Sequence, residues 1–370
     1  MIALAFPPID GEVFSPVPML THLKLRHLRC FEVATCQLRG GTTVFLGENA
    51  QGKTSVLEAV CVVMRLQSPR TANLADLVRF GQNEFAISAG LDGQELLFGY
   101  SGNRRRMTVD GETMRSSGDY LRHSALVVWM SNDDMALVRG GSEGRRRFLD
   151  FLGSQLYPVY RPALRDYERA LRARNFLLKR DAHPRWDQID AYTQVLAEHA
   201  AVLTTLRREI VARLEPFAAA VQAEVSGRPE PLGLSYEAAG GDNLREVLAG
   251  FRDEELRRRG TAAGPHRDDL GIKLHGMPAA RFSSEGQQRT TALALKIGQA
   301  RLFLAESRRP PLLLLDDIFG ELDPGRRNAL MAALPPDSQK LVTTTHLTWL
   351  EDHLHPETIL EVVRGSLVAR

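Results

Sequence analysis

The sequence predicts an α/β fold, in which a mixed sheet and an antiparallel β subdomain are interrupted by an inserted helical lobe. The first observation is an apolar strand pattern at residues 42–46, which leads through a glycine-containing loop into a helix pattern. The second is the apolar run Leu312–Leu315, which ends in two aspartates. The third is helical periodicity in most of residues 131–261. We therefore expect one domain split into residues 20–130 and 262–370, with the lobe at 131–261 inserted between them.

The composition restricts the class of protein. A chain of 370 residues with 44% hydrophobic and 25% charged residues is typical of a soluble globular protein of one or two domains. No apolar run approaches the length of a membrane span, and no cleavable signal peptide is evident. The three cysteines form no CxxC pair, which predicts free thiols in a reducing compartment, the cytoplasm. Because the net charge is only +2, nucleic-acid binding would depend on local basic patches.

The N-terminal part is predicted to be rich in strands. Residues 1–19 are proline-rich and aperiodic, and we expect a poorly ordered extension there. Strands are expected at Leu20–Leu28, at Thr35–Leu38 and directly before the glycine-containing loop, and a helix is expected from Lys53 to about Leu66. Short strands separated by glycine-containing turns then predict an antiparallel sheet. These strands are expected at 85–87, 95–100, 107–109 and 112–114, and a further buried strand at 126–129.

The inserted lobe is predicted to contain a short antiparallel helical hairpin. Apolar residues recur at alternating spacings of three and four on two stretches, which are separated by a break at residues 181–186. The residues of this seam are Tyr160, Leu164, Tyr167, Leu171, Ile189, Tyr192, Leu196, His199, Leu203, Leu206 and Ile210. At 1.5 Å per residue the hairpin would reach only about 35 Å. Two ordinary bundle helices fit the same pattern.

The C-terminal part returns to alternating strands and helices. Loop and strand character resumes at residues 260–270, and a helix is expected from Ser283. Buried strands are expected at 312–315 and 341–345, and a hairpin at 359–368 closes the chain. These elements complete the domain that the lobe interrupts.

The loop after residues 42–46 matches the pattern G-x-x-x-x-G-K-[ST], a Walker A loop. It consists of Gly47, Glu48, Asn49, Ala50, Gln51, Gly52, Lys53 and Thr54. The glycines allow a tight turn whose N–H groups face phosphate oxygens, and the following helix N-terminus adds a positive field. Lys53 would place its charge on the β- and γ-phosphates, and the Thr54 hydroxyl would bind Mg²⁺. The strand before the loop and the helix after it favour ATP binding over a chance match.

Residues 311–317, PLLLLDD, predict a Walker B strand, because parallel strands deliver carboxylates at the edge of the sheet where ligands bind. Asp316 would hold Mg²⁺, directly or through water, and Asp317 would polarise the attacking water. A generic buried strand that ends in two acids is the alternative. Glu321-Leu322-Asp323 follows at the spacing of the D-loop of ABC-type ATPases. His346, at the end of the next predicted strand, matches their switch histidine, which contacts the γ-phosphate; a strand-end histidine without that role is the alternative.

Residues 283–289, SSEGQQR, resemble the signature motif of the same ATPases and lie shortly before the Walker B strand. Ser284 would cap a helix whose N–H groups can face a γ-phosphate, and in that class the phosphate belongs to the other subunit. Gly286 and Gln287 are part of the same motif. A capping box between Ser284 and Gln287 is the alternative, and both interpretations can hold together.

With these motifs in place, the chain resembles the RecF family, bacterial recombination-mediator ATPases that are related to SMC heads. The resemblance spans nearly the whole length. Besides the Walker motifs and the D-loop it is carried by LEA at 57–59, SPRT at 68–71, RRRFLD at 145–150, GPHRDD at 264–269 and GQQR at 286–289. The departures are Leu28-Arg29-Cys30-Phe31, where the family has F-R-N-Y, and Ser131-Asn132-Asp133-Asp134, which replaces S/T-P-E-D.

The resemblance implies an ABC/SMC-like P-loop ATPase head that forms an ATP-dependent homodimer and has weak, DNA-stimulated ATPase activity. It implies binding to single-stranded and to gapped or linear double-stranded DNA. It also implies work with RecO and RecR in loading RecA during DNA repair, replication restart and the SOS response, in the nucleoid-associated cytoplasm. The implied catalytic residues are Lys53, Asp317 and His346, and the implied Mg²⁺ ligands are Thr54 and Asp316. The implied nucleotide contacts are the Walker A residues, Arg29, Ser284, Gly286, Gln287 and Asp323.

Basic clusters at 104–106, 145–147 and 257–259 could contact DNA, and solvated surface arginines are the alternative for each cluster. Because no aromatic platform is interleaved with them, phosphate contacts are favoured over base readout. Rival functions are the nucleotide-binding subunit of a transporter, which would need a surface that couples to membrane helices, and a structural SMC head, which would need longer arms than residues 157–220 allow. The signature-type motif argues against a P-loop kinase.

Overall fold

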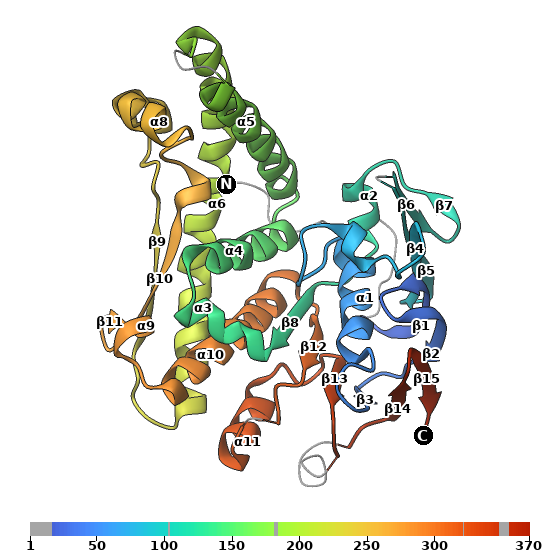
Figure 1. Ribbon diagram of the computed structural model, residues 1–370. Coiled ribbons are helices and arrows are strands. Elements are labelled where there is room, and N and C mark those ends of the chain that lie inside the picture. Colours follow the sequence, from blue (N-terminus) through green and yellow to red (C-terminus); the bar gives the residue numbers. More distant parts are fainter. Residues whose placement is uncertain (1–16, 103, 181–183, 321, 348–354) are drawn as a thin grey trace. The chain divides into compact units, whose positions relative to one another are not determined.

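The computed structural model describes residues 17–102, 104–180, 184–320, 322–347 and 355–370 (Figure 1). Most of the predicted N-terminal extension and Glu321 of the predicted D-loop therefore lie outside the described residues. The chain divides into two compact units. Residues 135–298 form the helical unit, and the described residues up to 134 together with 299–370 form the sheet unit. Residues 262–298, which the sequence-based division groups with the ATPase domain, are part of the helical unit.

The sheet unit contains a six-stranded mixed sheet with the strand order β15-β14-β3-β13-β12-β8. The strands are β3 Thr42–Leu46, β8 Val127–Ser131, β12 Leu312–Asp316, β13 Lys340–Thr344, β14 Thr358–Val363 and β15 Ser366–Ala369. All neighbours pair in parallel except β14 and β15. Both predicted Walker strands and the closing hairpin are confirmed. Because β3, β13 and β12 are parallel neighbours, the segments that follow them meet at one edge of the sheet.

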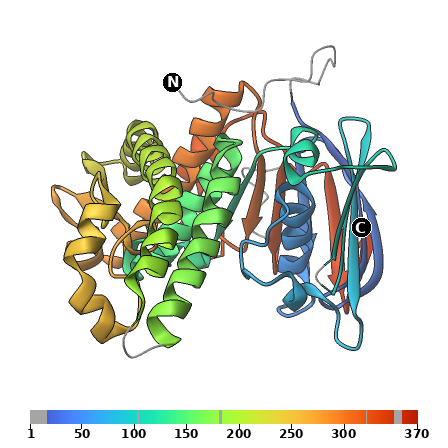
Figure 2. The same ribbon diagram turned by 90° about the horizontal axis from the view of Figure 1, so that it is seen from above.

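The second sheet of this unit is antiparallel, with the order β2-β1-β4-β5-β6-β7. Its strands are β1 Leu20–Leu28, β2 Phe31–Gln37, β4 Glu84–Leu91, β5 Gln94–Ser101, β6 Arg104–Val109 and β7 Glu112–Thr113. The strand predicted at Thr35–Leu38 is therefore longer and begins at Phe31, since the turn at Arg29 starts it directly after β1. Helix α1, Lys53–Arg65, lies between the two sheets, and all its residues except Thr54 are buried (Figure 2). The remaining helices of the unit are α2 Ser117–Arg122 and α11 Pro324–Ala333, with short 3₁₀ turns at Leu74–Leu77 and Asn132–Asp134.

The helical unit contains the predicted hairpin. Its helices are α3 Met135–Arg139, α4 Ser142–Leu156, α5 Tyr160–Arg180, α6 Trp186–Ser226, α7 Leu244–Gly250, α8 Arg252–Arg258 and α9 Ala279–Phe282, and α10 Glu285–Ser307 begins in it. α5 packs along α6, which confirms the hairpin. The predicted reach of about 35 Å agrees with α5, whose 21 residues give a length of about 32 Å, whereas α6 has 41 residues and is about 60 Å long. Part of the predicted break between the helices, residues 181–183, lies outside the described residues.

The seam of the hairpin is more polar than predicted. Seven of the eleven predicted residues are buried, among them Tyr160, Tyr167 and Ile189. Leu164, Leu171 and His199 are only partly buried, and Tyr192 is 41% exposed. Thr193 takes its place in the interior, because its hydroxyl accepts a hydrogen bond from the buried Arg174. A heptad pattern of apolar residues could not indicate this polar interior position.

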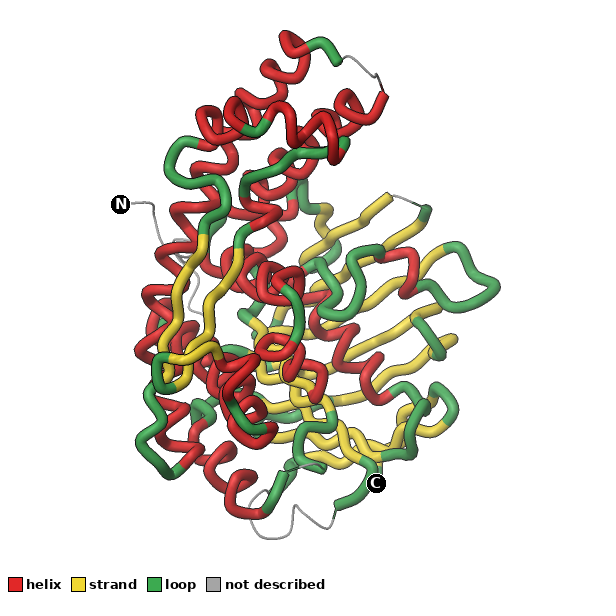
Figure 3. Tube along the Cα trace, turned by 60° about the vertical axis from the view of Figure 1, so that its left-hand side comes forward, coloured by secondary structure: helices red, strands yellow, loops and turns green. Residues whose placement is uncertain are grey.

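The helical unit also contains a three-stranded antiparallel sheet, and the strand of this sheet that falls within residues 131–261 was not predicted. The strands are β9 Leu232–Glu237, β10 Asp269–Leu274 and β11 Met277–Pro278, in the order β11-β10-β9. β9 packs along α6 (Figure 3). The alternation of Leu232 and Leu234 with the small residues Gly233 and Ser235 was the available signal, and it was missed because only a short segment carries it. Among the described residues, no helix is both long and apolar enough to cross a membrane.

Candidate functional site

The Walker A loop follows β3, and its shape requires both glycines. Gly52 has φ 109°, and a Cβ atom there would lie 2.5 Å from Cys30 Sγ. A Cβ atom at Gly47 would lie 2.5 Å from the backbone oxygen of Val362. Lys53 Nζ donates to the backbone oxygens of Gly47 and Glu48, at 2.7 Å each. Burial lowers the pKa of Lys53, while the charges of the two Walker B aspartates oppose that shift. The lysine is therefore held over the loop beside both acids.

The Walker B carboxylates lie where β12 ends. Asp316 Oδ1 accepts hydrogen bonds from the hydroxyls of Thr54, at 2.9 Å, and Thr343, at 2.8 Å. Burial raises the pKa of Asp316, and these two hydrogen bonds oppose the rise. Asp317 has φ 52°, and its N–H donates to Thr343 Oγ1 at 3.0 Å. The carboxylate of Asp317 makes no hydrogen bond or ion pair within the described part of the chain, so it is free to contact a water molecule.

The donor set at this edge fits a hard cation. Thr54 contributes a hydroxyl and Asp316 a carboxylate, and both are oxygen ligands of the kind that Mg²⁺ prefers. Mg²⁺ at nucleotide sites takes one or two protein ligands besides phosphate and water, and two are offered here. Thr343 was missed by the sequence analysis. Its position at the end of the strand between the two Walker strands was the available signal.

His346 follows β13 and lies beside the Walker A loop. It lines a cavity of 660 Å³ together with Gly47 and Gln51. Its ring Nδ1 lies 2.9 Å from the hydroxyl of Thr345, and its side chain is exposed. The position fits a phosphate-sensing histidine, although the next segment, residues 348–354, lies outside the described residues. The switch role of His346 stays a prediction.

Arg29 is held by an acidic side chain that the sequence analysis did not single out. Its guanidinium donates two hydrogen bonds of 3.1 Å to Glu58, a fully buried carboxylate on α1. Ser68 Oγ donates to the same carboxylate at 2.5 Å, and Arg70 lies 3.6 Å from it. Glu58 thus ties the turn after β1 to the SPRT segment. A phosphate contact by Arg29 stays a prediction. The available sequence signal for Glu58 as the partner of Arg29 was a glutamate within an otherwise apolar helix.

Asp323 caps a helix. Its Oδ1 accepts the N–H of Arg326 at 3.0 Å at the start of α11. This capping role is enough to explain an aspartate at this position, whether or not it also contacts a nucleotide. Its predicted nucleotide contact is not tested by the geometry.

The signature-type residues begin α10 in the helical unit. Gln287 N–H donates to Ser284 Oγ at 3.3 Å, and Ser284 N–H donates to Gln287 Oε1 at 2.9 Å. The capping-box interpretation is therefore confirmed. Ser284 is exposed and Gly286 lies in the first turn of the helix. The first N–H groups of a helix have no partner within it, so this end can receive an anion. Its phosphate role stays a prediction.

The basic clusters differ in how their arginines are used. Arg145 pairs with Asp269 through contacts of 2.7 and 2.8 Å, and Arg146 donates to the backbone oxygen of Asp268. The cluster at 145–147 therefore serves mainly to hold the helical unit together. Arg258 pairs with Glu254 at 2.7 Å. At 104–106, by contrast, all three arginines are exposed and have no ion pair with a described residue.

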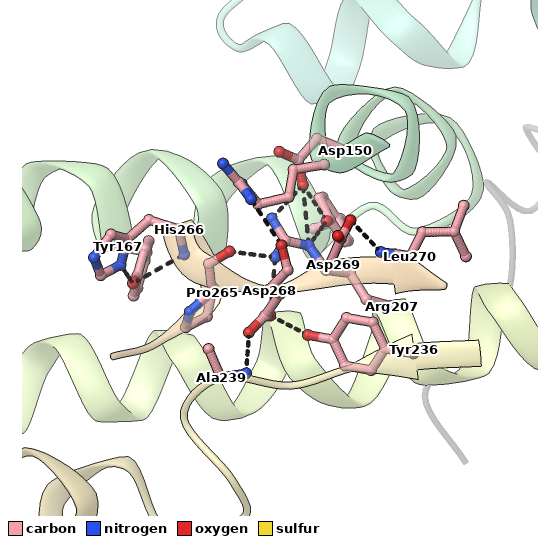
Figure 4. A network of polar contacts seen from close by, with 12 residues as sticks. Asp150, Tyr167, Arg207, Tyr236, Ala239, Pro265, His266, Asp268, Asp269 and Leu270 are labelled. Atoms are coloured by element: carbon pink, nitrogen blue, oxygen red, sulfur yellow. Dashed lines mark hydrogen bonds and ion pairs between the residues drawn. The ribbon is translucent and has the colours of Figure 1, made fainter. Parts of the chain in front are cut away.

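The GPHRDD segment is part of a buried polar network (Figure 4). Arg207, only 2% exposed, donates to the backbone oxygen of Pro265 at 2.7 Å and to the carboxylates of Asp268 and Asp150. Asp268 also accepts hydrogen bonds from the Tyr236 hydroxyl and the Ala239 N–H. The segment thus joins α4, α6 and the β-sheet of the helical unit. Its acidic residues are occupied by structural contacts.

The fold and the site together define a class of protein. A strand–Walker A–helix unit, a parallel Walker B strand, an antiparallel sheet and a helical unit that carries a signature-type capping box form the ATPase head shared by ABC and SMC proteins. Solved SMC heads agree at the level of the fold. One bound to the winged-helix domain of ScpA has a TM-score of 0.52 at 13% identity, over 95% of this chain and 97% of that chain. A family model described as an AAA domain matches residues 22–136.

Within this class, the chain belongs to the RecF family. It is 37% identical to the DNA replication and repair protein RecF of Synechococcus sp. over 94% of this chain and 97% of that protein. It is 35% identical to RecF of Geobacillus kaustophilus over 95% of this chain and 99% of that protein. A solved structure described as the recombination mediator protein RecF with ATP, in the RecFOR pathway, has a TM-score of 0.87 at 26% identity. That match covers 98% of this chain and 100% of that chain.

Proposed function

We propose that this chain is an ATP-dependent, DNA-binding recombination mediator. The observation that carries the proposal is the hydrogen bond between Thr54 and Asp316, which brings both Walker motifs to one edge of the sheet. Lys53 and the loop N–H groups would bind the phosphates of ATP. Thr54 and Asp316 would hold Mg²⁺, which neutralises phosphate charge when bound. Asp317 would orient the attacking water, and His346 would contact the γ-phosphate.

ATP binding, not hydrolysis, would drive formation of a homodimer. Ser284, Gly286 and Gln287 of one subunit would face the γ-phosphate that Lys53 holds in the other. The capping box supports this role, because it sets the start of α10 in advance of any ligand. Asp323 and Arg29 would add nucleotide contacts. Hydrolysis would be weak, stimulated by DNA and would end the dimeric state.

DNA would bind to the outer face of the antiparallel sheet. Arg26, Ala86, Gly99 and Arg106 lie opposite one another on four adjacent strands, so the side chains of the two arginines and Ala86 share a face. They line a hollow of 510 Å³ together with Arg104 and one acidic residue, Glu84. Two small residues between two arginines leave room for a phosphate backbone. Contacts of this kind are independent of sequence and suit both single-stranded and gapped double-stranded DNA.

The membership of the RecF family supports a proposal for the pathway. The RecF structures among the relatives are described as part of the RecFOR pathway. We infer that this chain works with RecO and RecR to load RecA on gapped DNA, in repair, replication restart and the SOS response. A cytoplasmic, nucleoid-associated location belongs to the same proposal.

Sedimentation velocity with and without ATP, and with and without a gapped DNA duplex, tests the proposal. We expect a monomer without ATP, a dimer with ATP, and co-sedimentation with DNA that depends on ATP. A monomer under all four conditions would contradict it.

A further inference from the structure

The side chain of Gln287 is held at both of its polar atoms. Its Oε1 accepts the N–H of Ser284 at 2.9 Å, and its Nε2 donates to Glu230 Oε1 at 3.0 Å. Glu230 lies in the segment between α6 and β9 and is only 9% exposed. The contact therefore links the first turn of α10 to a residue that is 57 positions away in the sequence.

A second hydrogen bond fixes the position of the Glu230 carboxylate. Its Oε2 accepts a hydrogen bond of 2.8 Å from Nε2 of Gln222, a fully buried residue of α6. Glu230 therefore makes one hydrogen bond through each carboxylate oxygen, and both donors are amide groups. A carboxylate in this position fixes which way the Gln287 amide points, because only the Nε2 end of that amide can donate to it. The Oε1 end must then face Ser284.

The next residue of the motif is fixed separately. Gln288, 7% exposed, donates to the backbone oxygens of Ala279, Ala280 and Ser283, and accepts a hydrogen bond from Arg139. These contacts hold the backbone at the start of α10 whatever Gln287 does. Glu230 therefore acts on the orientation of one side chain, not on the presence of the helix.

We infer that Glu230 is a positioning residue for the signature motif. It holds Gln287 so that the capping box with Ser284 is formed before a second subunit presents its γ-phosphate. The inference rests on the proposed function, in which this helix end receives the phosphate of the partner. Without Glu230, a partly exposed glutamine with many rotamers would have to be ordered during association, and dimerisation would weaken.

Two variants of Glu230 separate hydrogen bonding from charge. Glu230→Ala removes both acceptors. Glu230→Gln keeps an oxygen for Gln287, and its new amide can donate to Gln222 if that amide flips. The flip is allowed because Gln222 Oε1 has no hydrogen-bond partner among the described residues. We expect Glu230→Ala to raise the dimer dissociation constant with a non-hydrolysable ATP analogue by about tenfold, as for loss of one hydrogen bond. Glu230→Gln should stay within about threefold of the wild type.

A double variant serves as the control for misfolding. Glu230→Ala leaves Gln222 buried without its acceptor, whereas the double variant Gln222→Leu/Glu230→Leu removes both partners and should be nearly neutral for folding. It should weaken dimerisation as much as Glu230→Ala. Binding of a fluorescent ATP analogue to the monomer should be unchanged in every variant, because neither residue belongs to the Walker A loop. If Glu230 had only a structural role, its variants would lower the thermal stability, and the dimer affinity would fall only as far as the stability falls.

Ser284→Arg in the same assay separates this inference from the proposed function. If Ser284→Arg dimerises like the wild type, the signature motif does not face the partner and the proposed function itself is wrong. If Ser284→Arg abolishes the dimer while Glu230→Ala or the double variant dimerises normally, only the role of Glu230 is refuted. Equal weakening by Glu230→Gln and Glu230→Ala would also refute it, because charge rather than hydrogen bonding would then be responsible.

Discussion

The Thr54 hydroxyl donates a 2.9 Å hydrogen bond to the Asp316 carboxylate, although the two residues are 262 positions apart in the sequence. The bond joins the first turn of the Walker A helix to the end of the Walker B strand. The two oxygen groups are therefore close enough to bind one small cation together. This relationship makes the Mg²⁺ dependence of ATP binding testable at one residue.

Thr54→Val keeps the branched shape of the side chain but removes the hydroxyl. ATP affinity of the wild type should fall by about tenfold or more when EDTA replaces Mg²⁺, whereas Thr54→Val should bind weakly in both conditions. Thr54→Ser retains the hydroxyl and serves as the control, with a Mg²⁺ response like that of the wild type. The measurement is an ATP titration by calorimetry. A full Mg²⁺ response in Thr54→Val would refute the assignment of Thr54 as a ligand.

Asp317→Asn should slow hydrolysis and trap ATP-bound dimers on DNA. Asp317 is one methylene shorter than the glutamate that ABC transporters carry at this position, so a water would be polarised from farther away. The wild type should therefore turn over well below the enzyme median of about 10 s⁻¹. Phosphate release and gel filtration with ATP measure the two effects. Wild-type turnover at or above that median would contradict hydrolysis as a slow switch.

Ser284→Arg should leave ATP binding nearly intact but abolish the ATP-dependent dimer. The added side chain would fill the space in front of the α10 N-terminus, where the partner's phosphate is expected. Ser284→Ala is the matched control, because it removes the cap without adding bulk and should weaken the dimer only partly. Sedimentation with a non-hydrolysable analogue distinguishes the variants. Normal dimerisation of Ser284→Arg would show that this helix end does not face the partner.

DNA affinity should depend on ATP and fall steeply with salt, because the proposed dimer would present two copies of the arginine-lined hollow. Arg106→Gln should reduce the slope of log affinity against log salt by about 0.9 for each phosphate of duplex DNA that the variant no longer neutralises. Glu84→Gln, which removes the acid from the same hollow, should strengthen binding. The Lys53→Met variant should bind DNA weakly at every salt concentration.

A salt titration of fluorescence anisotropy, with and without ATP, measures all of these variants. Sequence preference should be slight, since phosphate contacts carry no base information. Equal affinities of wild type and Lys53→Met in the presence and absence of ATP would mean that DNA binding is independent of the dimer. Equal salt slopes of wild type and Arg106→Gln would remove the hollow from the DNA interface.

The helical unit should lose stability below neutral pH because of His266. Its Nδ1 lies 2.6 Å from the Tyr167 hydroxyl, and burial lowers its pKa to about 4. The folded pKa lies below the unfolded value of about 6.5, so the contribution is complete above pH 6.5 and is lost as the pH falls towards 4. At pH 5 the free energy of unfolding should be lower by about 2 kcal/mol. Urea unfolding at several pH values measures the effect in the wild type and in His266→Gln, a variant that can keep both ring hydrogen bonds. The free energy of unfolding should depend less on pH in the variant. Identical pH dependence would exclude His266 as its source.

The Walker A loop and the start of α10 could be predicted from the sequence because their geometry is local. The turn at Gly47 and Gly52 and the capping box of Ser284 and Gln287 each involve residues within a few positions of one another. Backbone sterics and short-range hydrogen bonds therefore determine them almost without help from the rest of the chain. The parallel Walker B strand was also predictable, since an unbroken apolar run must be covered on both faces.

The partners of buried polar groups could not be predicted in this way. Nothing in the spacing of residues indicated that Glu58 would form an ion pair with Arg29. Nor did it indicate that Arg145, a candidate DNA contact, would instead pair with Asp269. Similarly, Thr193 rather than Tyr192 entered the hairpin interior. A charged side chain can be equally stable in water or against an opposite charge, and the choice depends on which distant segment arrives beside it.

The sequence by itself determined the location of the proposed phosphate and cation site, because Gly47, Lys53, Thr54 and Asp316 carry their chemistry in their own side chains and local turns. Only the tertiary structure decided which groups hold that chemistry in place. Thr343 reaches Asp316 because β13 lies between the two Walker strands, and Glu230 reaches Gln287 from the segment that joins α6 to β9. Both contacts are hydrogen bonds between residues far apart in the chain. Their formation depends on strand order and helix packing, which no local pattern specifies.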